Sequence, residues 1–146
     1  MGSQFCSYAF RHPGRPRPRC DLPASDRGRC IFHGGTVSDD FEEQFLKTLV
    51  DRDHWLEGAV IHIDLRRAEI SNAKLPYINF EGVTLQSVAF YNTLLEGANF
   101  RNCTIMDSIF RHCELHAAVF DRAILGQDKC AATIKVAGSP TIILAG

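Results

Sequence analysis

The most regular feature of the chain is the spacing of its large apolar residues. From Val60 to Leu125 every fifth residue is large and apolar, and the residue two positions before it is mostly small. On an α-helix five residues turn through about 500°, which would spread these side chains over every face. In one flat strand an odd spacing would alternate them between the two faces. The spacing instead predicts short extended sides separated by corners, with the apolar residue of each side pointing inward.

Four such sides would close a coil of twenty residues, and stacked coils would bury a continuous interior. Residues 58–127 are therefore predicted to form an all-β solenoid of four-sided coils, with about 3.5 coils in the stack. Residues twenty positions apart are matched in type along this segment. We expect one ladder of Phe80, Phe100 and Phe120. A second ladder, of Phe90 and Phe110, would lie on the opposite side.

The repeated units resemble those of a known family. Residues 98–102 (Ala-Asn-Phe-Arg-Asn) and 123–127 (Ala-Ile-Leu-Gly-Gln) are similar to the A(D/N)LXX unit of pentapeptide-repeat proteins. The resemblance extends over residues 58–127, and it implies a right-handed quadrilateral β-helix. The chain departs from the family at the second position of the unit, where Asp or Asn is common and this chain has residues such as Lys74 and Leu94.

The segments that flank the repeats have different patterns. Residues 1–37 form a Cys/His-rich segment, residues 38–57 a capping helix and junction, and residues 128–146 a C-terminal cap or tail. From Ser38 to Arg52 apolar residues recur at helical spacing, which predicts an amphipathic helix. Because the open end of a solenoid exposes apolar interior and strand edges, we expect this helix to cap it, with partner binding as the alternative. The tail could cover the other end or form a dimer edge.

The N-terminal segment holds four residues that could bind one metal ion. Cys30 and His33 are close enough in sequence to share an ion on one tight turn, and Cys6 and Cys20 would complete a tetrahedral site. His12 is a substitute ligand. A segment so rich in Arg and Pro cannot fold by burial alone, and structural zinc would supply the missing stability. Three free thiols in an unstructured leader are the alternative. The Cys-Ile-Phe-His sequence also resembles the cysteine-rich segment found before the repeats in some bacterial pentapeptide-repeat proteins.

The charge of the chain is distributed in blocks. Residues 1–33 hold six arginines against two aspartates, a net charge of +4, whereas residues 34–57 hold seven acidic and two basic residues, a net charge of −5. The basic block could bind nucleic acid, but it has no basic helix and no interleaved aromatic residues. We therefore expect the two blocks to neutralise each other, and we do not expect nucleic acid as a partner.

No apolar run is long enough to cross a membrane, and residues 1–19 lack the apolar stretch of a signal peptide. We therefore expect a cytoplasmic protein that does not bind membranes. In that compartment the six cysteines would be thiols or metal ligands rather than disulfides.

Apolar residues at outward positions predict a contact surface in the C-terminal half of the solenoid. They are Tyr91, Leu94, Met106, Ile109, Val119 and Ile124. The partner would be an unidentified protein or a second copy of this chain. No Ser-His-Asp set, glycine-rich phosphate loop or paired carboxylate stands out. In His112-Cys113-x2-His116 the cysteine would point inward and the histidines outward, so they could not share an ion.

These observations predict a non-enzymatic bacterial interaction module with no catalytic residues and a structural zinc ion. The family resemblance adds an alternative, because some pentapeptide-repeat proteins imitate DNA and act on DNA gyrase, a topoisomerase. Such mimicry needs a strongly negative column. Residues 58–127 have a net charge of only −1, and Arg66, Arg67 and Arg101 interrupt any acidic stripe, which disfavours this alternative.

Overall fold

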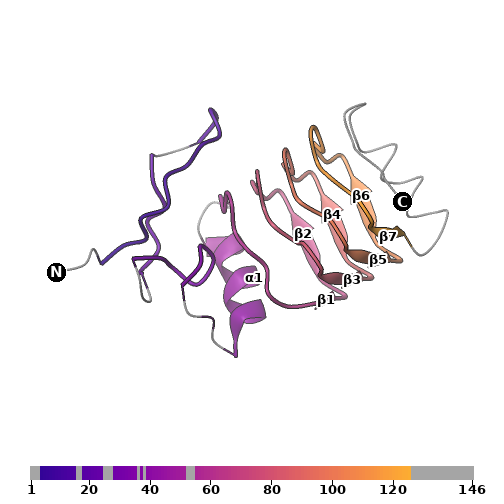
Figure 1. Ribbon diagram of the computed structural model, residues 1–146, viewed down its shortest axis with the longest axis horizontal. Helices are drawn as coiled ribbons and strands as arrows, with labels where there is room; N and C mark the ends of the chain where they lie inside the picture. The colour runs from indigo at the N-terminus through magenta and orange to yellow at the C-terminus, as the bar shows by residue number, and fades with distance from the viewer. Residues whose placement is uncertain are drawn as a thin grey trace.

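The computed structural model describes residues 4–15, 18–24, 28–35, 37, 39–51 and 55–125, and it shows a stack of coils with a helix at one end (Figure 1). The elements are α1 (Phe41–Asp51), β1 (Leu65–Arg66), β2 (Glu69–Ser71), β3 (Thr84–Gln86), β4 (Ala89–Tyr91), β5 (Thr104–Met106), β6 (Ile109–Arg111) and β7 (Ile124–Leu125). The cap or tail predicted for residues 128–146 lies outside the described residues. Among the described residues, no helix has the length and apolar character needed to cross a membrane.

The strands form two parallel sheets, in the orders β1-β3-β5-β7 and β2-β4-β6. Single parallel bridges join successive coils on the other two sides. One pair from each of the four sides is Leu65–Leu85, Glu69–Ala89, Lys74–Leu94 and Asn79–Asn99. The two members of each pair are twenty residues apart, so each coil has four sides. The β-solenoid predicted from the five-residue spacing is therefore confirmed.

The corners between the sides have left-handed backbone. The non-glycine residues at these corners have φ angles from 49° at Asn92 to 60° at Tyr77. Such angles cost most L-amino acids roughly 1 kcal/mol each. Hydrogen bonds between coils offset this cost, since a corner such as Asn72 donates its backbone N–H to the Tyr91 carbonyl of the next coil at 3.0 Å.

The interior contains the two predicted phenylalanine ladders. The rings of Phe100 and Phe120 are stacked with centroids 4.7 Å apart, and those of Phe90 and Phe110 are stacked at 4.8 Å. The ladders meet edge to face, with 5.7 Å between the centroids of Phe100 and Phe110. Both arrangements suit the charge distribution of aromatic rings. All four rings are buried, so they fix the width of each coil.

The first coil is one residue shorter than the later coils, which corrects the sequence prediction. Trp55 bridges Lys74 and Val60 bridges Asn79, so the members of each pair are nineteen residues apart. The inward residue of this side is therefore Ile61, which is 3% exposed, and Val60 is only half-buried. The five-residue spacing selected the wrong one of two adjacent apolar residues.

The described residues between 4 and 35, here called the head, set this register. In a later coil the equivalent residue, Asn99, donates its backbone N–H to the carbonyl of Ile78 in the coil before it, at 2.9 Å. Val60 donates instead to the carbonyl of Phe32 at 2.8 Å. Phe32 thus takes the place of a preceding coil. The inward ladder also begins earlier than predicted, because Leu56 is buried in the first coil.

Helix α1 forms within the predicted span and lies at the N-terminal end of the coil stack (Figure 1). It buries Phe41, Phe45 and Leu49, which share one helical face. The ring of Phe41 packs edge to face on Phe32 at 5.4 Å and on His62 of the first coil at 5.9 Å. The helix therefore contacts both the head and the solenoid. Residues 38 and 52, the ends of the predicted helix, lie outside the described residues.

Candidate metal centre

Backbone pairing within the head brings Cys6 and Cys20 together. The Cys6 N–H donates to the Leu22 carbonyl at 2.9 Å, and the Cys20 N–H donates to the Tyr8 carbonyl at 3.0 Å. These bonds belong to an antiparallel arrangement of two short segments. Residues fourteen positions apart in sequence thereby reach the same place.

A tight turn supplies the other two candidate ligands. The His33 N–H and the Gly35 N–H both donate to the Cys30 carbonyl, at 3.0 and 2.9 Å. Gly34 between them has a φ of 98°, which glycine adopts without strain. The turn therefore places the side chains of Cys30 and His33 on the same side.

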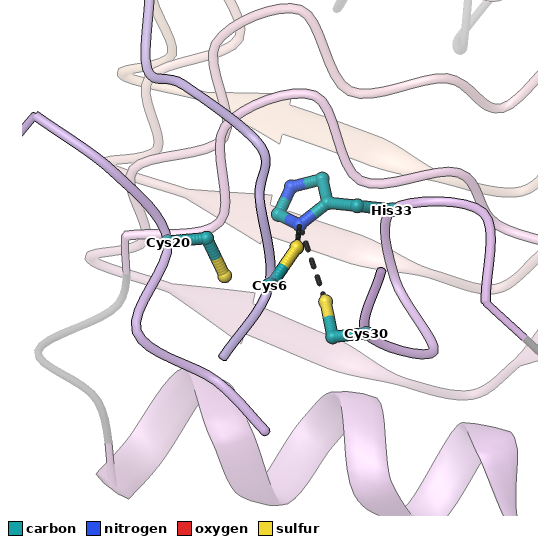
Figure 2. Close-up of side chains that lie close together, drawn as sticks. All are labelled: Cys6, Cys20, Cys30 and His33. Carbon is teal, nitrogen blue, oxygen red and sulfur yellow. Dashed lines mark hydrogen bonds between the residues drawn. The ribbon is translucent and has the colours of Figure 1, made fainter. Parts of the chain in front are cut away.

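The structure brings all four predicted ligands into one buried cluster (Figure 2). The three sulfur atoms and the imidazole nitrogen all lie within 4.8 Å of one another. Nδ1 of His33 is 3.4 Å from Sγ of Cys6 and 3.2 Å from Sγ of Cys30. A tetrahedral zinc site has ligand atoms roughly 3.5–3.8 Å apart, given its usual bond lengths. The cluster could therefore hold one metal ion.

The thiols and the imidazole change one another's protonation. Hydrogen bonds from Cys20 and Cys30 hold the pKa of the Cys6 thiol well below its usual range, although burial opposes this. Burial lowers the pKa of His33, but hydrogen bonds to the sulfur atoms of Cys30 and Cys6 outweigh burial and raise it to about 9. The cluster thus favours a thiolate beside an imidazolium. A metal cation would replace these protons, as thiolate sites require.

The other side of the His33 ring is held by the solenoid and by Tyr8. Nε2 of His33 lies 2.7 Å from the backbone carbonyl oxygen of Glu57, which can only accept a hydrogen bond. Nε2 therefore carries a proton, and Nδ1 is the nitrogen that faces the sulfur atoms. The Tyr8 ring stacks on the imidazole with centroids 4.1 Å apart and planes inclined by 8°. These contacts fix the orientation that a ligand histidine needs.

The substitute ligand His12 lies elsewhere in the structure. Its Nε2 is 2.7 Å from a carboxylate oxygen of Glu96, and its ring packs edge to face on Trp55. Contacts with the solenoid thus occupy His12, and it is not part of the cluster of four. The structure favours Cys6, Cys20, Cys30 and His33 over any set that includes His12.

The motif His112-Cys113-x2-His116 is arranged as predicted. Cys113 is buried, and its thiol donates to the Phe90 carbonyl at 3.3 Å. His112 and His116 are exposed. Cys103 is buried in the same way, and its thiol donates to the Phe80 carbonyl. Both cysteines therefore serve packing rather than metal binding.

The six outward apolar residues predicted to form a contact surface lie on all four sides of the solenoid. They are distributed as Met106 and Ile124 on the β1-β3-β5-β7 sheet, Tyr91 and Ile109 on the β2-β4-β6 sheet, Leu94 on the third side and Val119 on the fourth. Leu94 is buried, and it is bridged by Lys74 and Glu114 of the neighbouring coils. Ile124 is 61% exposed, and the other four are half-buried.

Sequence reasoning missed Glu57 and Tyr8, the two residues that support His33. Glu57 stands among other acidic residues, and Tyr8 is one of several aromatic residues near the N-terminus. Neither has a spacing that marks it as a partner of the cluster. Their positions depend on how the head docks on the first coil.

The comparison with protein families agrees with this architecture. Residues 63–102 match the family model described as pentapeptide repeats, with eight copies. The match covers the first coils of the stack, so this part of the chain consists of pentapeptide repeats that form a β-solenoid. No curated protein matches the chain.

Proposed function

We propose that this protein is a non-enzymatic protein–protein interaction module whose head is held together by one structural zinc ion. The observation that carries the proposal is the buried cluster of Cys6, Cys20, Cys30 and His33. The head has little else in its interior, because Phe10 and Phe32 are its only other buried side chains among the described residues. A cross-link by metal would supply the stability that apolar burial does not.

The ligand chemistry favours zinc. Three thiolates and one imidazole are a common ligand set of structural zinc sites, whereas magnesium and calcium prefer oxygen ligands. The separations among the four ligand atoms suit a single ion. Four protein ligands leave no open coordination position for a substrate, so the ion would support the fold rather than catalysis. The reducing cytoplasm, where we place the protein, would keep the thiols free of disulfides.

The solenoid is the part that would bind a partner. Stacked coils give flat, stiff sides, and repeat proteins use such surfaces for binding. The C-terminal end of the β1-β3-β5-β7 sheet presents apolar side chains to solvent, with Met106 half-buried and Ile124 exposed. Ile109 lies on the adjacent side. We propose a protein partner for this region, either a different protein or a second copy of the chain.

The surface charges argue against the alternative function, DNA mimicry directed at gyrase. Arg66, Arg67, Arg101 and Arg111 are exposed on the sides of the solenoid. A surface that imitates DNA would present rows of negative charge, which these arginines interrupt. A supercoiling assay with gyrase tests this alternative directly, and we expect no inhibition.

Metal content tests the zinc proposal. Untagged protein, purified without added zinc, should contain one zinc ion per chain by plasma mass spectrometry, which also separates zinc from iron. The double variant Cys30→Ser/His33→Ala should lose the metal. Cys113→Ser is the matched control, because Ser108 already occupies the equivalent inward position on another side. An absence of metal in the native protein would overturn the proposal.

A second experiment tests the interaction surface. The variant Ile109→Lys/Ile124→Lys should abolish self-association in light scattering or capture of the partner in a pull-down. Thr104→Lys is the control, because it adds one charge beside the same surface without removing an apolar side chain. Unchanged behaviour of the double variant in both assays would remove this surface from consideration.

A further inference from the structure

We infer that Glu57 is a positioning residue that couples the metal centre in the head to the first coil of the solenoid. The inference rests on the proposed zinc site. It concerns a residue that binds no metal itself. Its side chain and its backbone carbonyl contact two different parts of the head.

Glu57 is a fully buried acidic residue at an outward position of the coil. It follows the inward residue Leu56, and the equivalent residues in the later coils are Pro76, Glu96 and His116, as the backbone pairing shows. Of these, Pro76 is also buried, Glu96 is half-buried and His116 is exposed. Glu57 has 0% exposure. This outward position becomes accessible only in the third and fourth coils, and at Glu57 its burial encloses a carboxylate.

The carboxylate of Glu57 is satisfied by backbone of the head. The Arg11 N–H donates to one oxygen at 2.5 Å, and the His12 N–H donates to the other at 2.6 Å. A buried carboxylate without such donors would be strongly destabilising. The two amides are therefore needed by Glu57, and Glu57 in turn fixes the place where residues 11 and 12 cross the coil.

The backbone carbonyl of Glu57 reaches the metal centre. It accepts the hydrogen bond from Nε2 of His33 at 2.7 Å, which directs Nδ1 towards the three sulfur atoms. One residue of the solenoid thus holds the ligand histidine through its main chain and the segment that follows Cys6 through its side chain. A displaced carboxylate would also displace the carbonyl that orients His33.

Two further contacts extend the docking of residues 11 and 12 along the solenoid. The guanidinium of Arg11 lies over the ring of Tyr77, 4.5 Å from its centroid, and His12 contacts Glu96. Glu57, Tyr77 and Glu96 belong to successive coils. Zinc binding and the docking of the head across these coils should therefore be a single coupled event.

The test compares the zinc affinity of Glu57→Gln with that of Glu81→Gln, an exposed glutamate of the second coil. Competition with a chromophoric chelator gives both affinities. Glu57→Gln replaces one acceptor oxygen by an NH₂ group that cannot accept the amide N–H. We expect about 10- to 100-fold weaker zinc binding, the effect usual for loss of a partner that orients a ligand. Glu81→Gln should bind zinc as the native protein does.

Cobalt spectroscopy separates positioning from ligand loss. Saturated with Co²⁺, Glu57→Gln should keep the thiolate charge-transfer bands and the tetrahedral bands of the native protein, because all four ligands remain. The thermal stability of the solenoid without metal should be unchanged, which a merely structural role would not predict. Zinc affinity equal to that of Glu81→Gln would overturn the inference and leave the zinc proposal intact. Native protein that binds no metal would overturn both.

Hydrogen exchange of the native protein tests the coupling between zinc binding and docking of the head even if Glu57→Gln does not fold. With zinc bound, the amides of Arg11 and His12 should be protected by the Glu57 carboxylate. After chelation they should exchange quickly, while the Phe100 amide, which donates to the Val119 carbonyl, should stay protected. Persistent protection of residues 11 and 12 without zinc would show that docking does not depend on the metal, against the inference.

Discussion

The inward positions of the solenoid hold large apolar residues in every coil, whereas four of the six buried side chains of the head are the candidate metal ligands. Each coil contacts its neighbours through parallel hydrogen bonds and stacked side chains. The stability of the solenoid is therefore spread over many similar contacts, as in other repeat proteins. The stability of the head is concentrated at one point. A change at that point should affect the head alone, and a change in one coil should affect the whole stack.

Removal of zinc should have the largest effect, and it should be confined to the head. Structural zinc contributes about 10–16 kcal/mol of binding free energy in zinc-finger peptides, so a head with only two other buried side chains should unfold without it. Chelation should expose Cys6, Cys20 and Cys30 to iodoacetamide, as measured by mass spectrometry of peptides.

Cys103 and Cys113 provide the internal control for this experiment. Burial raises the pKa of Cys103 to about 12 and also raises the pKa of Cys113, so both thiols stay protonated at neutral pH. A protonated and buried thiol reacts slowly. Equal alkylation of Cys103 and the head cysteines after chelation would mean that the solenoid also depends on the metal.

Phe100→Ala should break the solenoid rather than the head. The Phe100 ring stacks between Phe80 and Phe120, with centroids 5.2 and 4.7 Å away. Its removal should lower the free energy of unfolding by about 3–5 kcal/mol, as for other buried aromatic residues. Ile124→Ala, at an exposed position, should cost far less. Denaturant unfolding followed by circular dichroism measures both, and a Phe100→Ala variant as stable as Ile124→Ala would contradict the ladder as the main source of stability.

The same contrast explains how much could be predicted from the sequence. The solenoid repeats its contacts, so the spacing of residues such as Phe80 and Phe100 was enough to predict the sides and the ladders. The register of the first coil could not be predicted in this way, because it depends on a remote residue, Phe32, and because Val60 and Ile61 are both apolar. In the head the close spacing of Cys30 and His33 indicated a metal site, which Cys6 and Cys20 could complete. Glu57 could not be recognised, because only the docked head gives it a role.

A matched pair of glycines tests whether docking of the head reaches the metal. Gly58 and Gly97 occupy equivalent corners of the first and third coils, both with a φ of 69°. An added Cβ would overlap the ring of Tyr8 at Gly58 and that of Tyr77 at Gly97. Each change to alanine should cost about 1–2 kcal/mol from the backbone alone. Gly58→Ala should weaken zinc binding more than Gly97→Ala, because Tyr8 stacks on the ligand His33, whereas Tyr77 contacts Arg11 and His12, which are not ligands.

Zinc competition and thermal unfolding of the two glycine variants give both quantities. Gly97→Ala serves as the control for strain in the coil. If the two variants lost zinc affinity equally, the effect would come from the solenoid as a whole, and Tyr8 would have no special part in supporting the site.

Loss of the contact between His12 and Glu96 should have the smallest effect on stability. This contact joins the head to the solenoid. Both side chains keep some contact with water, with exposures of 14% and 33%, so solvent screens their attraction. Glu96→Gln should lower the stability of the docked head by less than about 1 kcal/mol, and the loss should shrink as salt is raised. Exchange rates of the Arg11 and His12 amides measure this directly. A loss as large as that of Glu57→Gln would show that this exposed pair, rather than the buried carboxylate, holds the head on the solenoid.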